Sequence, residues 1–90
     1  MIVNINVTAD HIARGRPACC DSCPITLALT ESTGIEWMVV AGHAVLRDTH
    51  YWLWLPDFVW DWILTYDREG AAAVAPFSFA LDLALELLPT

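Results

Sequence analysis

The chain has 90 residues, of which 57% are hydrophobic, and its 11 acidic and 4 basic side chains give a formal net charge of -7. This length predicts one domain over residues 1–90, and so apolar a composition excludes an intrinsically disordered chain. The basic residues are all arginines, too few and too scattered for DNA or RNA binding. The acidic residues are also dispersed, which disfavours a DNA mimic.

A membrane or secreted protein is not expected from the apolar segments. The longest uncharged run, residues 70–81, is shorter than the roughly 18 residues that cross a bilayer, and it contains Pro76. The first residues lack the basic and apolar regions of a signal peptide. We therefore expect a cytoplasmic protein that does not enter membranes, whose cysteines stay reduced and form no disulfide scaffold.

A strand and two helices are expected before residue 35. Apolar residues alternate with asparagines over residues 3–7, which is the pattern of a half-buried strand. A short helix then ends at Gly15, and a second helix has Pro24 in its first turn and ends at residues 33–34. The expected N-cap residues are Thr8 for the first helix and Asp21 or Ser22 for the second.

The remaining elements complete an α+β domain. Alternating patterns over residues 35–41, 44–47 and 51–55 predict a three-stranded antiparallel meander. A helix follows from residue 56 to about residue 67 and stops near Gly70, and a last strand covers residues 77–83. The predicted order is β-α-α-β-β-β-α-β in a single small domain, with helices packed on one face of a mostly antiparallel sheet.

Three cysteines within five residues, in P-A-C-C-D-S-C-P (17–24), raise the question of a metal site. Cys20 and Cys23 have the spacing of a zinc knuckle, and Cys19 and His11 are nearby candidates for further ligands. Structural zinc needs four sulfur or nitrogen ligands, usually from two separated pairs, and no second pair follows. We therefore expect no metal and no cofactor. The alternative is a structural-zinc module that uses Cys20, Cys23 and His11, with Cys19 as a further ligand.

A redox site is a weaker interpretation of the same cysteines. A CxxC motif at a helix start favours a thiolate, but a strand should feed it directly, and here a short helix and a connector precede it. Free cysteine packs as a small hydrophobic residue. We therefore expect Cys23 to be buried at the helix start, and Cys19 and Cys20 to lie in a tight connector.

Catalytic patterns are absent from the sequence. It contains no GxSxG, glycine-rich phosphate loop or HExxH motif. Asp57 and Asp61 lie four residues apart on one helix face, which a solvated polar face explains better than acid–base chemistry. His11 is expected to have a structural role, bonded to the connector that carries the cysteines. The chain is therefore predicted not to be an enzyme.

Tryptophans exceed what the predicted core needs. On the helix over residues 56–67, one polar stripe is expected at Asp57, Asp61 and Thr65, and the core face at Phe58, Val59, Trp62, Ile63 and Tyr66. Trp60 and Leu64 belong to neither. In the preceding strand Tyr51, Leu53 and Leu55 share one face, which leaves Trp52 and Trp54 on the other.

These extra side chains have two interpretations. The domain can wrap around them, or they can form an interface, since tryptophan is enriched at binding hot spots. We expect an interface with a protein partner, either a homodimer or a host protein. Its residues are Trp52, Trp54, Trp60 and Leu64.

Three motifs resemble a family of small, uncharacterised proteins encoded by actinobacteria and by their phages. They are H-I-A-R-G (11–15), C-P-I-T-L-A (23–28) and P-F-S-F (76–79), and the resemblance covers most of the chain except the meander. It implies a phage or prophage origin and a location in the host cytoplasm, and it brings no catalytic residues. The sequence thus predicts a small acidic, non-enzymatic protein that acts by protein–protein interaction.

Overall fold

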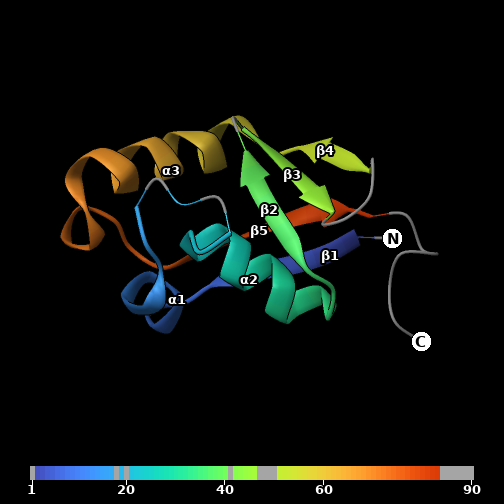
Figure 1. Cartoon of the computed structure of the whole chain (residues 1–90), viewed down its shortest axis with the longest axis horizontal. Helices are drawn as coiled ribbons and strands as arrows, with labels where there is room; N and C mark the ends of the chain where they lie inside the picture. Colours follow the sequence, from blue (N-terminus) through green and yellow to red (C-terminus); the bar gives the residue numbers. More distant parts are fainter. Residues whose placement is uncertain (1, 18, 20, 41, 47–50, 84–90) are drawn as a thin grey trace.

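Helices and strands follow one another in the order that the sequence predicts, and the α+β class is confirmed (Figure 1). The computed structural model describes residues 2–17, 19, 21–40, 42–46 and 51–83. Its elements are β1 (Ile2–Val7), α1 (Ala9–Arg14), α2 (Pro24–Thr33), β2 (Trp37–Val40), β3 (His43–Leu46), β4 (Trp52–Trp54), α3 (Asp57–Glu69), the short 3-10 helix η1 (Ala71–Ala73) and β5 (Phe77–Asp82).

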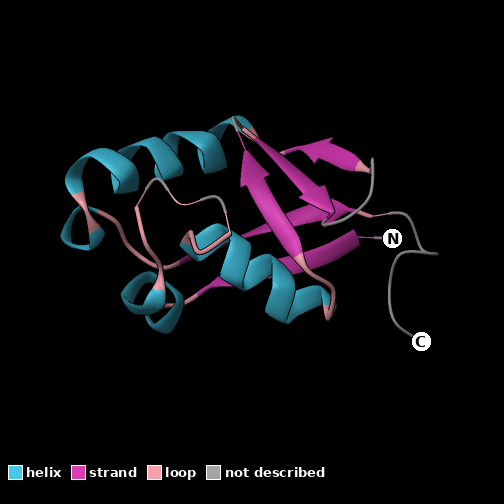
Figure 2. Ribbon diagram, viewed as in Figure 1, coloured by secondary structure: helices cyan, strands magenta, loops and turns pink. Residues whose placement is uncertain are grey.

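The strands in the described part of the chain pair in two antiparallel sheets, where the sequence suggested one (Figure 2). β1 pairs with β5 from Ile2 opposite Asp82 to Val7 opposite Phe77. β2, β3 and β4 form the second sheet in chain order, which is the predicted meander. The first sheet therefore brings together two segments from opposite ends of the sequence.

One hydrophobic core joins both sheets and the helices. α2 packs against β1 of the first sheet and β2 of the second, and it passes in front of β1 in Figure 1. Side chains that are at most 2% exposed come from both sheets, from α2 and α3 and from the residue after β5; they include Ile5, Val7, Ile25, Ala28, Leu29, Trp37, Ala44, Val59, Tyr66 and Leu83.

The short helix α1 is held at both ends by local contacts. The Thr8 hydroxyl accepts from the backbone N–H of His11 at 3.3 Å, and the His11 ring accepts from the backbone N–H of Thr8 at 3.0 Å. This is a reciprocal capping box. Gly15 ends the helix as predicted, and a Cβ there would lie 2.6 Å from two ring atoms of Pro24. Close packing against α2, rather than an unusual φ, therefore requires glycine.

The N-cap of helix α2 lies two residues after the first expected cap residue, Asp21. Its N-cap is Cys23, not Asp21 or Ser22, because Pro24 takes the first helical position, where no intrahelical donor is needed. Gly34 ends the helix in the left-handed region, at φ 77°, as the sequence predicts.

Helix α3 buries a narrower face than the helical wheel predicts. Val59, Ile63 and Tyr66 are buried as expected. Phe58, assigned to the core, is instead 56% exposed, and Trp62 is half-buried. Phe58 lies beside the first residue of β5, with its ring centroid 6.2 Å from that of Phe77, so a single aromatic neighbour covers it where the sheet ends.

Candidate functional site

The β2-β3-β4 sheet has one apolar face toward the core and another on the outside. Alternation along the strands directs Trp37, Val39 and Ala44 inward, and all three are buried. The alternate positions form what we call the outer face: Met38, Val40, His43, Val45, Trp52 and Trp54. Along these described strands, the outer face has no acidic residue, lysine or arginine.

The tryptophans of the outer face are well exposed and contact one another. Trp52 is 51% exposed and Trp54 is 66% exposed, and their ring centroids lie 5.2 Å apart in an edge-to-face arrangement. The His43 ring packs edge-to-face against both, at 5.4 and 5.3 Å. Such T-shaped contacts are the favoured geometry of aromatic pairs. The Nδ1 atom of His43 is buried and has no hydrogen-bond partner among the described residues.

Of the two α3 residues predicted for the interface, Trp60 borders this surface. Trp60 is half-buried against the core, and its ring covers Gly42. For this residue, the interpretation that the domain wraps around the extra tryptophans therefore holds in part. It also lines a shallow cavity of about 200 Å³ together with Trp54 and Asp57, next to the outer face. Leu64 is 37% exposed and follows Trp60 by one turn of α3.

A second aromatic surface lies between α3 and the start of β5, and sequence reasoning missed it. Phe58, Trp62 and Phe77 line an open cavity of about 420 Å³ there. The Trp62 indole donates to the backbone carbonyl of Ala75 at 3.0 Å and stacks on Tyr66 with centroids 5.6 Å apart. The helical wheel placed Phe58 and Trp62 in the core because it shows in which direction a side chain leaves the helix. It does not show how far the elements packed against α3 extend.

The two described cysteines, Cys19 and Cys23, lie in different environments. Cys23 is 4% exposed, as predicted, and burial raises the pKa of its thiol, while the backbone amides of Ile25 and Thr26 act in the opposite direction. A protonated thiol is a poor nucleophile and a poor metal ligand. Cys19 is half-buried, and its Sγ donates to a carboxylate oxygen of Asp21 at 3.0 Å. Cys20 lies outside the described residues.

His11 uses one ring nitrogen to cap α1 and the other to contact α2. Its Nδ1 accepts from the Thr8 amide, so the proton lies on Nε2, which is 3.1 Å from the Glu31 carboxylate. The expected bond to the cysteine connector is replaced by these two contacts. A zinc ligand would have to give up one of them. In the part of the chain that the structure describes, no group of three or more His, Cys, Asp or Glu side chains could hold a metal ion.

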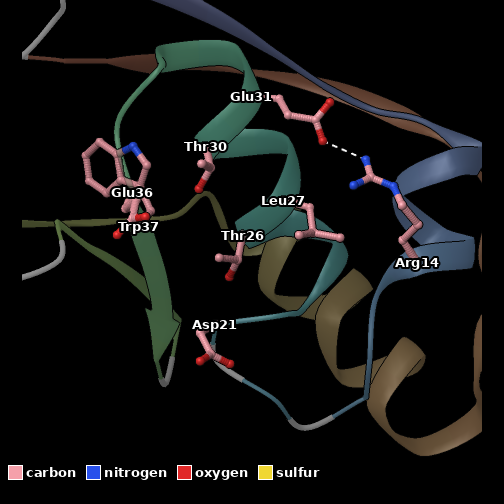
Figure 3. A pocket seen from close by; sticks show the side chains of 8 residues that line it. All are labelled: Arg14, Asp21, Thr26, Leu27, Thr30, Glu31, Glu36 and Trp37. Atoms are coloured by element: carbon pink, nitrogen blue, oxygen red, sulfur yellow. Dashed lines mark hydrogen bonds and ion pairs between the residues drawn. The ribbon is translucent and has the colours of Figure 1, made fainter.

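An ion-pair network links α1 to α2 beside a cavity of about 300 Å³ (Figure 3). Arg14 donates to Glu31 at 2.6 Å across the two helices and to Asp10 at 2.8 Å within α1. Arg14 and, to a smaller extent, His11 lower the pKa of Glu31. Figure 3 shows the Arg14 and Glu31 side chains pointing toward each other, so the basic group of this cavity is already neutralised. The arrangement docks two helices, and among the described residues that line the cavity the one basic side chain, Arg14, is already paired.

The other lining residues of this cavity come from α2 and from the segments before and after it. α2 contributes Thr26, Leu27 and Thr30 beside Glu31, and the other lining residues are Asp21, before α2, and Glu36 and Trp37, at the start of β2. The ion pair of Asp10 and Arg14 can be predicted from the sequence, because the two residues are four apart on one helix. The contact of Arg14 with Glu31 depends on how the two helices pack.

Comparisons with known proteins leave the site to be interpreted from its own geometry. No protein-family model, no curated protein and no solved structure matches the chain. Within the described segments, no helix combines the length and the apolar character that a bilayer crossing requires. Asp57 and Asp61 are exposed on α3, as the sequence predicts.

Proposed function

We propose that this chain is a small non-enzymatic protein that binds another protein through the outer face. The observation that supports this is a sheet face of uncharged side chains with two largely exposed indoles, on a chain whose net charge is -7. Exposed apolar patches of this kind mark interaction sites, and tryptophans near the centre of an interface often supply most of its binding energy.

The chemistry of the outer face favours a protein partner over other ligands. Stacking of nucleic-acid bases on tryptophan needs nearby cations to bind phosphates, and the outer face has none in its described strands. The adjacent cavity, at about 200 Å³, is below the roughly 300–1,000 Å³ of small-molecule sites. The ionisable network of Arg14 and Glu31 serves helix docking instead of acid–base chemistry.

The cellular setting follows from the resemblance of three motifs to proteins of actinobacteria and their phages. We place the protein in the cytoplasm of a bacterial host, encoded by a phage or prophage, where its partner is a host protein or a second copy of the chain. The resemblance supports this setting.

The test compares an outer-face variant with a matched control. Trp52→Thr/Trp54→Thr removes both indoles but keeps strand propensity, and Phe58→Ala removes an exposed aromatic ring from α3, outside the outer face. Each protein is immobilised, and captured host proteins are quantified by mass spectrometry and then purified for affinity measurement. We expect a partner held by the wild type and by Phe58→Ala to bind the double variant roughly thirtyfold more weakly.

Stability must be measured in parallel. The double variant should keep the wild-type circular dichroism spectrum and unfold at a similar denaturant concentration, because both side chains are largely outside the core. An unfolded double variant would show that these tryptophans belong to the core. A folded double variant with unchanged affinity for every partner would refute the proposed function.

A further inference from the structure

The outer edge of β4 has backbone hydrogen-bonding groups that no other described strand uses. The Leu46 amide donates to the Tyr51 carbonyl at 3.0 Å, and the Leu55 amide donates to the Gly42 carbonyl at 3.0 Å. Backbone groups of alternate residues point to opposite edges of a strand, so those of Trp52 and Trp54 point away from β3. Among the described residues, β4 pairs with β3 and with no strand on its other side. Figure 1 shows β4 at the margin of the fold.

The sequence of β4 is the same in both directions. It reads Trp-Leu-Trp, with Leu53 at the centre. An antiparallel pair of identical strands with its two-fold axis at Leu53 therefore places Trp52 of each copy opposite Trp54 of the other. Trp52 and Trp54 are also the two residues whose backbone groups face the free edge, so register and hydrogen-bonding capacity agree.

We propose that two copies of the chain pair antiparallel through β4, an inference that rests on the proposed function of the outer face and names its partner. Each pair of Trp52 with Trp54 then exchanges two backbone hydrogen bonds across the two-fold axis. The β2-β3-β4 sheets of the copies become one continuous sheet. The four indoles meet on one face of it as cross-strand neighbours, which is a favourable arrangement for aromatic side chains.

Charge is compatible with a second copy at this edge. The strand carries no charged residue, so pairing buries no ion, whereas each whole chain has a net charge of -7 and the copies repel one another at long range. Salt screens that repulsion over about 10 Å at 0.1 M ionic strength. Association should therefore strengthen as salt is added, which is the opposite of an interface built on ion pairs.

The exposed area predicts a weak dimer. With about 250 Å² for a whole indole side chain, the 51% and 66% exposure of Trp52 and Trp54 leaves about 600 Å² for four tryptophans in two copies. Stable complexes bury about 1,200 Å² or more, so the contact belongs to the small, transient class. We therefore expect a dimer that forms in the micromolar range and dissociates on dilution.

The experiment measures association and the pairing edge together. Sedimentation equilibrium from about 1 µM to about 1 mM gives the dissociation constant, and NMR hydrogen exchange at both ends of this range reports individual amides. We expect the Trp52 and Trp54 amides to exchange fast when the protein is dilute and slowly when it is concentrated. Stacking of two outer faces without strand pairing would leave both amides unprotected, and that result would overturn the inference.

Matched variants localise the contact. Trp52→Thr/Trp54→Thr should weaken the dimer roughly thirtyfold, whereas Val40→Thr, an exposed residue of the same face on β2, should leave it unchanged. Equal loss from both variants would indicate packing of whole faces and overturn edge pairing.

The two proposals fail in different ways. A chain that stays monomeric throughout this range, yet loses a host partner when both tryptophans are replaced, overturns the dimer and leaves the proposed function intact. A dimer that is unaffected by that replacement contradicts edge pairing, whatever host proteins the chain binds.

Discussion

Replacing Cys23 distinguishes a structural cysteine from a zinc ligand by the size of the effect. Cys23 is 4% exposed and is the N-cap of α2. Cys23→Ala deletes one buried atom of about methyl size, which should cost about 1 kcal/mol of unfolding free energy. Cys23→Ser loses similar burial, but a serine hydroxyl at an N-cap can accept from the amide of Ile25 or Thr26 and regain about 1 kcal/mol. We therefore expect the serine variant to be the more stable of the two.

If Cys23 were a zinc ligand, replacing it would cost far more unfolding free energy. A structural zinc ion contributes about 10–16 kcal/mol of binding free energy, as much as the whole stability of an ordinary domain, about 5–15 kcal/mol. Loss of a ligand would then unfold the chain for either substitution. Urea unfolding followed by tryptophan fluorescence measures the change, and elemental analysis of protein purified without chelator counts the metal. Unfolding of both variants, or one zinc per chain, would refute the structural interpretation.

Two further predictions concern the contact between α1 and α2. Gly15→Ala should cost about 1–3 kcal/mol of unfolding free energy, because its Cβ would overlap the Pro24 ring. In a double-mutant cycle, Pro24→Ala should relieve that cost. Gly70→Ala is the control: its Cβ would have no atom within 4 Å, so it should show only the strain of its positive φ. Glu31 has a lowered pKa in the fold, so its ion pairs stabilise the chain above the ordinary pKa of about 4.3 and are lost as pH falls through the lowered value. Circular dichroism against pH should therefore show a smaller loss of stability in acid for Glu31→Gln than for the wild type, and Glu69→Gln should behave like the wild type.

Local signals made most element boundaries predictable. Thr8 and Gly34 act through contacts with residues close in sequence, and together with Gly15 they begin or end helices where expected. The division of the strands into two sheets could not be predicted from the sequence, because β1 pairs with β5, which lies at the other end of the described chain. Alternation of side chains shows that a strand has two faces but does not identify the strand it pairs with.

The site was predictable in part for the same reason. Alternation placed Trp52 and Trp54 on one face of a strand, and the structure confirms that this side is exposed. Trp60 was expected beyond the core and is half-buried, since Gly42 lets the sheet approach its ring. The free edge of β4 could not be inferred, because it depends on which strand ends the sheet.

The capping of α1 ties one ionisable side chain, His11, into the contacts that hold the helices. His11 is the third residue of the helix, where a glutamate or glutamine ordinarily completes a capping box, and here its ring takes that role with Thr8. The opposite side of the ring contacts Glu31, which also accepts from Arg14, so one network holds the end of β1 and both helices together. The described side chains of this network are thereby held in structural contacts. Trp52 and Trp54, outside the network, are uncharged and largely exposed, in line with the proposed binding function.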